Sequence, residues 1–226
     1  MKCVLATKDN YWSNHLFSRL QEDSDVDWLI VNPPCRGLEN VLKSINPDWV
    51  FFFHWSDIVP KEIYENFKCV VMHTGNLPKD RGGSPIQNQI GRGVLHTKVN
   101  AIDMIDKVDA GGIYYSKGVT LQGNLFDVWM TIAETSKSVI DKCIFDNPTP
   151  VPQDNTKAKV HKRRRDNTLP LNSANLYELY RHIQMLDAEG YDPASVSLGD
   201  YTLEFSRPKL ESEKILCDLT IRRKDV

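Results

Sequence analysis

The sequence lacks long hydrophobic runs and any large excess of charge. None of its apolar runs approaches the roughly 18 residues of a membrane-spanning helix. The first apolar residues, Met1 to Leu5, give way to polar Lys8, Asp9 and Asn10 too soon for a signal peptide. A formal net charge of -2 provides no overall attraction to nucleic acid or anionic lipid. We therefore expect a cytoplasmic protein whose partners are small molecules, with no nucleic-acid or membrane partner.

Cysteine patterns that would indicate a metal site or a redox motif are also missing. The five cysteines are scattered along the chain, with no C-x-x-C pair and no histidine at metal-ligand spacing. This distribution predicts reduced thiols and no structural metal ion.

Short apolar runs alternate with segments of helical periodicity in the first half of the chain. The runs that predict buried strands are Lys2 to Ala6, Asp27 to Val31 and Trp49 to Phe53, and the helical patterns lie at Trp12 to Leu20 and Leu38 to Ile45. This alternation is typical of an α/β, Rossmann-like, mostly parallel sheet with helices on both faces. The glycine fingerprint of dinucleotide binding is missing, because Thr7-Lys8-Asp9-Asn10 stands in its place.

The second half predicts two further strands, a long helix and a small appendix. The strands are expected at His96 to Ile105 and Ile113 to Leu121, and the amphipathic helix at Asn124 to Phe145. Prolines at positions 148, 150 and 152 indicate a crossing segment. We therefore expect a catalytic core in residues 1–147, and a linker with a small C-terminal helix and β-hairpin in residues 148–226.

Polar side chains follow two of the predicted strands, where open α/β sheets bind their ligands. His54 and Trp55 follow the strand that ends at Phe53, and either core packing or a site role explains them equally well. His73 precedes a Gly/Asn/Pro loop that keeps it near the rim, which favours a functional role. Asp109 precedes a small-residue turn, where a local Asx cap is the ordinary explanation.

A glycine-rich turn leads into a predicted helix start. Ser84 is a good N-cap residue, and Pro85 suits the first helical position. The exposed N–H groups of Gly82 and Gly83 would suit an anion or a planar polar ligand, although an ordinary turn has the same sequence.

Several of these motifs, in this order, resemble the folate-dependent formyltransferase family. Asn-Leu-Pro-x-x-Arg-Gly-Gly-x-Pro-Ile-Gln begins three residues after His73, and Val-Asp-Ala-Gly-Gly-Ile-Tyr contains Asp109. The family includes glycinamide ribonucleotide, methionyl-tRNA and sugar N-formyltransferases. The resemblance implies 10-formyltetrahydrofolate as co-substrate and matches His73 and Asp109 to the catalytic His and Asp. One departure is Val71, where the family usually has Asn, and Asn76 is the nearest amide that would replace it.

The resemblance also implies a role for each site residue. His73 would donate a hydrogen bond to the oxyanion that forms on the formyl carbon, and Asp109 would orient His73 and receive the amine proton. The residues expected at the folate are Trp55, Ser56, Asp57, Val108, Asp109 and Ala110, and those expected at the amine substrate are Lys79, Arg81 and Gly83. No covalent intermediate with the enzyme is implied.

The C-terminal segment narrows the expected acceptor. Its helix from Leu176 and its strands at Thr202 to Phe205 and Lys214 to Ile221 look like the tail of short bacterial enzymes that formylate nucleotide-linked amino sugars. The segment looks too short and too weakly basic for the tRNA-reading domain of the methionyl-tRNA enzymes. We therefore expect a homodimeric N-formyltransferase acting on a dTDP- or UDP-linked 3- or 4-amino-dideoxy sugar for surface glycans such as lipopolysaccharide O-antigen.

Three alternatives remain open at this point. One is a formyltransferase acting on another small amine, such as a glycinamide ribonucleotide. A second is a non-catalytic folate- or nucleotide-binding relative, for which Val71 is the reason. A third is an RNA-binding module that uses the basic cluster from His161 to Arg165, a cluster that a solvated linker or a contact with the nucleotide diphosphate also explains.

Overall fold

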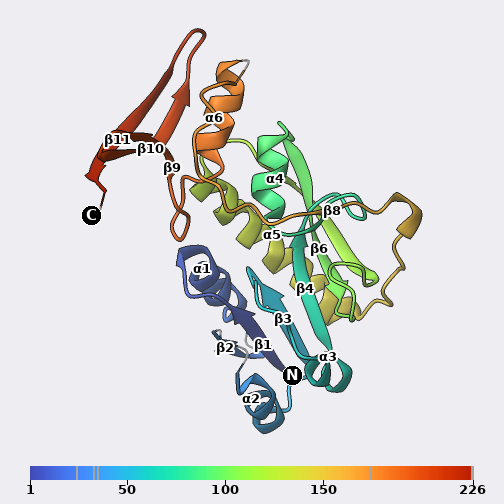
Figure 1. Cartoon of the computed structure of the whole chain (residues 1–226). Helices are drawn as coiled ribbons and strands as arrows, with labels where there is room; N and C mark the ends of the chain where they lie inside the picture. The colour runs from blue at the N-terminus through green and yellow to red at the C-terminus, as the bar shows by residue number, and fades with distance from the viewer. Residues whose placement is uncertain (24, 33, 35, 174, 225–226) are drawn as a thin grey trace.

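The structure, a computed structural model, describes residues 1–23, 25–32, 34, 36–173 and 175–224. The strands of its main sheet are β1 (Lys2–Thr7), β2 (Asp27–Val31), β3 (Trp49–Phe53), β4 (Cys69–Thr74), β6 (His96–Asp103) and β7 (Ile113–Thr120). Their spatial order is β2-β1-β3-β4-β6-β7 (Figure 1). β2, β1, β3 and β4 run parallel to one another, and β6 runs antiparallel to both of its neighbours, β4 and β7. The predicted mostly parallel, Rossmann-like sheet is confirmed.

Helices cover both faces of this sheet, as predicted. On one face lie α1 (Tyr11–Leu20) and α5 (Leu125–Asp146), and on the other α2 (Leu38–Ile45) and α3 (Lys61–Asn66). Successive strand residues point to opposite faces, so a continuous apolar run supplies two cores. Strand residues on the α5 side include Cys3, Leu5, Phe51, Phe53, Val70 and Met72, and those on the α3 side include Val4, Ala6, Val50, Phe52 and Cys69.

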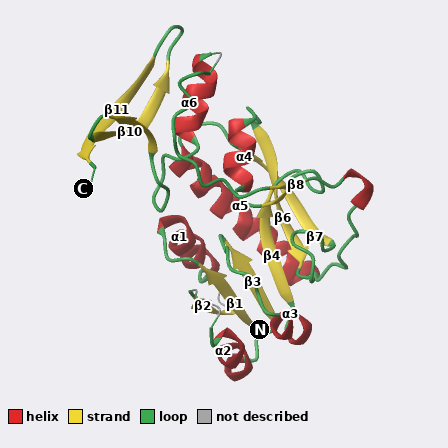
Figure 2. Ribbon diagram, in the orientation of Figure 1, coloured by secondary structure: helices red, strands yellow, loops and turns green. Residues whose placement is uncertain are grey.

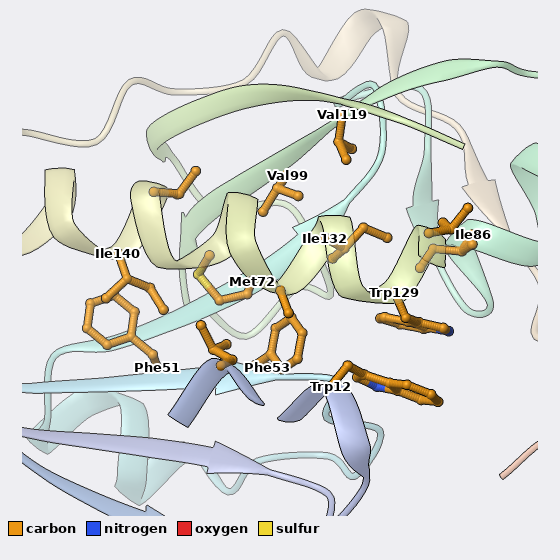
Figure 3. Packing of buried hydrophobic residues seen from close by; sticks show 14 of the residues in the cluster. Trp12, Phe51, Phe53, Met72, Ile86, Val99, Val119, Trp129, Ile132 and Ile140 are labelled. Atoms are coloured by element: carbon orange, nitrogen blue, oxygen red, sulfur yellow. The ribbon is translucent and has the colours of Figure 1, made fainter. Parts of the chain in front are cut away.

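Two stacked tryptophans join α1 to α5. The rings of Trp12 and Trp129 lie 5.2 Å apart with an interplanar angle of 9°. Figure 3 shows the two rings one above the other. In the same view Ile132 and Ile140 of α5 lie above Phe51 and Phe53 of the sheet. Among the described residues, none of the helices is long and apolar enough to cross a bilayer.

The C-terminal segment forms a helix and a separate antiparallel sheet. The elements are α6 (Leu176–Gln184), β9 (Ala194–Leu198), β10 (Tyr201–Leu210) and β11 (Ile215–Arg223). Figures 1 and 2 show this sheet projecting from the body of the molecule, with the C-terminus at its outer end. The predicted hairpin is present, and β9 extends it to three strands through a turn at Gly199 and Asp200.

The appendix packs against the core. Leu169, Ile183 and Ala194 are buried in the same hydrophobic cluster as Val128 and Ile132 of α5. This packing explains why the helix face predicted from the sequence is apolar. The division of the chain between residues 147 and 148 stays a prediction.

A return segment brings the linker back over the edge of the sheet. It contains the short helix η1 (Asn155–Lys157) and β8 (Val160–His161), which pairs in parallel with β5 (Arg81–Gly82). The helix predicted at Pro85 is α4 (Pro85–Gly91), and Ser84 stands at its N-cap position as predicted, but its side chain does not cap the helix. Ser84 has a φ of 47° and its side chain makes no cap hydrogen bond; its hydroxyl instead accepts from the Arg164 backbone N–H at 3.1 Å. The Ser84 hydroxyl is therefore bound by the return segment and not by the first turn of α4.

Candidate active site

A cavity of about 710 Å³ lies beyond the carboxyl ends of β1, β3 and β4. This is the edge where open α/β sheets bind ligands. Its lining comes from both faces of the sheet, and we name the two groups of lining residues the Trp55 arm and the His54 arm. The Trp55 arm, on the α3 side, includes Trp55, Val59, Tyr64 and Met104; the His54 arm, on the α5 side, includes His54, Gln87, Trp129 and Tyr191.

The structure brings His73 and Asp109 together between the two arms. His73 is the fifth residue of β4, and its side chain is 5% exposed. Its Nδ1 lies 3.5 Å from Oδ2 of Asp109, and its Nε2 lies 2.6 Å from the carbonyl oxygen of Asp80. A carbonyl oxygen only accepts hydrogen bonds, so Nε2 carries a proton and donates. Nδ1 is thus the ring nitrogen that faces the carboxylate.

Asp109 is fixed by its backbone conformation and by a neighbouring loop. Its φ is 53°, a left-handed conformation that Asp tolerates better than most residues. Its Oδ2 accepts a hydrogen bond from the Gly82 N–H at 2.8 Å. The carboxylate is therefore held beside His73 by the loop that carries the sequence motif, and does not cap its own turn.

A buried network links this loop to the turn that contains Asp109. The Arg81 guanidinium is 1% exposed and donates from Nε and Nη2 to Oε1 of Gln153, at 3.0 and 2.8 Å. Its Nη2 also donates to Asn155 at 2.9 Å. Gln153 Nε2 in turn donates to the carbonyl oxygens of Asp109 and Gly111, at 3.0 and 2.8 Å. Gln153 is a site residue that the sequence did not indicate, because it lies in a stretch assigned to the linker.

The three residues expected at the amine substrate are placed differently from the prediction. The expectation for Arg81 is wrong, because its guanidinium is enclosed by Gln153 and Asn155 and does not line the cavity. Lys79 is exposed and does not line the cavity either. Gly83 does line it.

The two glycines allow close approach of the return segment. A Cβ on Gly82 would lie 2.3 Å from the His161 carbonyl oxygen, and a Cβ on Gly83 would lie 2.8 Å from Cα of Arg163. Their N–H groups donate to Asp109 and to the carbonyl of His161. The anion-binding alternative for this turn is therefore wrong, because both N–H groups already have partners within the chain.

Most residues expected at the folate line the cavity. Trp55, Ser56 and Asp57 line it from the loop after β3, and Val108 and Asp109 from the loop after β6. Ala110 does not line it. The Nε1 of Trp55 is buried without a hydrogen-bond partner among the described residues, so this wall offers a free donor.

The structure does not bring Asn76 to the position where an amide donor was expected. Asn76 is absent from the cavity wall, and its backbone N–H donates to the Asp80 carboxylate at 3.1 Å. Asp80 is 7% exposed and also accepts from Arg92 at 2.5 Å. Asn76 and Asp80 therefore stabilise the loop, and the side chain of Val71 lines the cavity with no amide beside it in the motif.

The contacts of His54 bear on whether it packs the core or takes part in the site. Its Nδ1 accepts hydrogen bonds from Nδ2 of Asn10 at 3.0 Å and from Nε1 of Trp12 at 3.3 Å. Burial, together with the positive charges of Lys8 and Arg163, lowers the pKa of His54 to about 4. His54 is therefore a neutral imidazole in the cavity wall at physiological pH.

Thiol and metal chemistry find no support within the described residues. Cys3, Cys69 and Cys143 are buried and free, and burial raises the pKa of each thiol to about 12. Such thiols are poor nucleophiles at neutral pH. In the part of the chain that the structure describes, no group of three or more His, Cys, Asp or Glu side chains is placed to hold a metal ion.

Comparison with known proteins gives the family. Residues 165–222 match the family described as "Methionyl-tRNA formyltransferase, C-terminal domain". A methionyl-tRNA formyltransferase from Nitratiruptor sp. is 29% identical over 150 residues, which cover 63% of this chain and 50% of that protein. One from Campylobacter jejuni is 30% identical over 158 residues, covering 67% and 52%. The chain thus spans about half the length of the curated relatives it matches.

Solved structures extend the likeness over the whole chain. The structure of a methionyl-tRNA formyltransferase from Clostridium thermocellum is 34% identical, with a TM-score of 0.93 and 99% of each chain covered. A 4-N formyltransferase from Francisella tularensis is 18% identical, with a TM-score of 0.66, covering 86% of this chain and 91% of that one. At that identity the second likeness shows the fold alone.

These comparisons overturn the expected acceptor. The nucleotide-linked amino sugar is wrong, because the relatives that are 27% to 34% identical over most of the chain are named methionyl-tRNA formyltransferases. The C-terminal segment judged unsuited to those enzymes matches their C-terminal domain. The expectation of no nucleic-acid partner rested on net charge, which does not show that Arg163, Arg164 and Arg165 gather at the cavity. With 34% identity to a structure that it covers almost completely, the chain belongs to the formyltransferase family.

Proposed function

We propose that this protein transfers a formyl group from 10-formyltetrahydrofolate to the α-amine of an aminoacyl-tRNA, with methionyl-tRNA as the first candidate. The observation that carries the proposal is the His73–Asp109 pair, buried between two arms of one cavity in a chain of this family. The names of the relatives support the acceptor, and the site geometry supports the chemistry.

Formyl transfer makes three demands on the protein. The amine nitrogen must bond to the formyl carbon while the bond from that carbon to N10 of the folate breaks. The formyl oxygen gains negative charge on the way, the amine loses a proton, and the departing nitrogen takes one up. The protein must therefore supply a hydrogen-bond donor, a proton acceptor and a fixed orientation of both substrates.

His73 and Asp109 match the first two demands. The Nε2–H of His73 is anchored to the Asp80 carbonyl, so His73 can donate to the formyl oxygen only from a second proton on Nδ1, the ring nitrogen beside Asp109. Asp109 keeps its second carboxylate oxygen free of the Gly82 hydrogen bond, and that oxygen is the proposed acceptor of the amine proton. Only the imidazolium form of His73 donates from both nitrogens, so this is the form that the step requires.

The Trp55 arm fits the folate. Its walls include the aromatic rings of Trp55 and Tyr64 and the apolar side chain of Val59, which suit a flat heterocycle. The unpartnered Nε1 of Trp55 is a buried donor that a ring nitrogen or oxygen of the ligand would satisfy. When bound there, the folate supplies the formyl group.

We place the aminoacyl-tRNA at the basic segment that contains Arg163, Arg164 and Arg165. Arg163, Arg164 and Arg165 line the cavity at the end of the return segment, and Arg164 is oriented by its Nε hydrogen bond to Asn88 at 3.0 Å. Guanidinium groups suit phosphate oxygens, so we place the 3′ end of the RNA at this segment. The family match that begins at residue 165 supports a role for the following appendix in the same contact.

The test is formylation of charged tRNA by the purified protein. Methionyl-tRNA and 10-formyltetrahydrofolate are incubated with the protein or with His73→Ala, and N-formylmethionine is measured by mass after the ester is hydrolysed. We expect product from the parent and a loss of 100-fold or more, on the order given for an oxyanion donor, in the variant.

Two other outcomes would replace the proposal. Folate binding without product from methionyl-tRNA or from methionine methyl ester would identify a non-catalytic relative, with Val71 as the suspected reason. Formylation of the ester but not of the charged tRNA would remove RNA from the proposal. A rate with charged tRNA that does not change between low and moderate salt would contradict the phosphate contacts of the arginines.

A further inference from the structure

We propose that His54 is a binding residue of the His54 arm. It acts as a neutral imidazole, protonated at Nε2, that donates a hydrogen bond to an oxygen of the amine substrate close to the reacting nitrogen. The identity of the ligand rests on the proposed function, whereas the protonation pattern of the ring follows from the contacts below.

The first step is the tautomer. Asn10 caps α1, and its Oδ1 accepts from the Ser13 N–H at 3.0 Å, which identifies the other amide atom as Nδ2. That Nδ2 can only donate, and so can the indole Nε1 of Trp12. Both donate to Nδ1 of His54. Nδ1 must therefore carry a lone pair, and the single proton of the neutral ring lies on Nε2.

The second step is the persistence of this form. A proton on Nδ1 would face two N–H donors, and the ring of His54 is partly buried. The low pKa of His54, about 4, agrees with the contacts. Asn10 and Trp12 of α1 and Trp129 of α5 are uncharged, and Lys8 and Arg163 are the charged groups that oppose protonation. His54 is thus a fixed donor across the range in which ordinary histidines change charge.

The third step is the position of His54 relative to the chemistry. Phe53 pairs with Met72 in the parallel ladder of β3 and β4, so the next residues, His54 and His73, stand at the ends of adjacent strands. Neighbouring strands lie about 4.8 Å apart. His54 has a φ of 48°, which ends the strand and turns the chain at this point. Both histidines line the same cavity, so a ligand in it can contact His54 while its amine approaches His73.

The fourth step is the chemistry of the arm. Nε1 of Trp129 and Nε2 of Gln87 are buried in the cavity wall without a hydrogen bond of ordinary length among the described residues, although both stand near enough to the Tyr191 hydroxyl to oppose the rise in its pKa that burial causes. No described residue accepts a hydrogen bond from Nε2 of His54. A buried N–H without a partner is costly, so a wall with several of them favours a ligand rich in acceptor oxygens. The carbonyl of an aminoacyl ester, one carbon from the amine, is such a group.

The tautomer is tested without turnover. Two-dimensional NMR that correlates ring nitrogens with ring protons distinguishes the two neutral tautomers of each histidine, and His54→Phe assigns the signal. We expect a neutral ring with the proton on Nε2, unchanged from pH 8 to pH 5. A proton on Nδ1, or a charged ring at pH 6, would overturn the proposal.

The contact is tested with two small amines. Methionine methyl ester carries the carbonyl, and 3-(methylthio)propylamine has the same side chain and amine without it. Titration of each into the parent should move the His54 Nε2 signal with the ester only. Binding of the ester should weaken roughly two- to tenfold in His54→Phe, the usual effect of one hydrogen bond, with little change for the plain amine.

Controls separate this result from the proposed function. His96→Phe removes an exposed histidine at the start of β6 and should leave both affinities unchanged. Equal effects of His54→Phe on ester and amine would show that His54 only packs the arm and would overturn the inference. If the His54 signal responds to the ester while the parent forms no N-formyl product, the contact stands and the proposed reaction fails.

Discussion

Replacement of Gln153 by Met is the sharpest test of the buried network behind the active site. Met keeps the length of the side chain but loses the two hydrogen bonds accepted from Arg81 and the two donated to Asp109 and Gly111. The Arg81 guanidinium would keep only Asn155. A hydrogen bond to a charged group contributes about 1.5–3 kcal/mol, and a buried polar group left unpaired costs about 1–3 kcal/mol.

These values do not add fully, because Arg81 and the two carbonyls relax together. We therefore expect Gln153→Met to lower the free energy of unfolding by about 3 kcal/mol, which is near the lower end for breaking a buried charged contact. For a domain of this size that corresponds to a thermal midpoint lower by roughly 6–12 °C. Differential scanning calorimetry of parent and variant measures it directly.

The control is Gln122→Met, the same change at an exposed residue whose side chain makes no hydrogen bond in the structure. It should move the midpoint by about 1 °C or less, as surface substitutions usually do. The folate affinity of Gln153→Met should stay close to that of the parent, because the Trp55 arm is not part of the network, while kcat should fall. A midpoint for Gln153→Met equal to that of the control would refute the energetic role of Gln153.

Three other predictions follow from individual contacts. Asp109→Asn keeps the shape and tolerates the left-handed backbone, so it should fold normally yet lose roughly 100-fold or more of formyl transfer in single-turnover assays; full activity would exclude Asp109 as proton acceptor. Because the folded-state pKa of His54, about 4, lies below the ordinary 6.5, the unfolded chain binds the extra proton between those values, and the free energy of unfolding should fall as pH drops from 6.5 to 4, by at most about 3 kcal/mol. Urea titrations should show a smaller fall in His54→Phe, and an equal fall would contradict this assignment. Gly82→Ala should cost about 3 kcal/mol through its clash with the His161 carbonyl and its φ of 98°, whereas Gly118→Ala, with no atom closer than 4.0 Å, should be nearly neutral.

The elements themselves were largely predictable from local patterns. The strand at Trp49–Phe53 and the helix at Leu38–Ile45 match their predicted bounds, because a continuous apolar run and a helical stripe are each set by neighbouring residues. Strand β9 was missed, since it is short and only partly apolar and gains its hydrogen bonds from β10. The Ser84 side chain does not cap α4 because its hydroxyl accepts a hydrogen bond from Arg164, 80 residues away in the chain.

The sequence by itself determined the α/β class and the sheet edge that carries the site, and its resemblance to a known family supplied the pairing of His73 with Asp109. The first two are encoded in the order of apolar runs, and the pairing in two separate motifs whose His and Asp stand 36 positions apart in the chain. Tertiary structure alone decided the roles of Arg81 and Gln153. The two residues lie 72 positions apart in the chain and meet only after the return segment folds back over the loop. It also decided that Asn76 stays outside the cavity and that His54 presents Nε2, because both depend on which distant donors and acceptors surround a side chain.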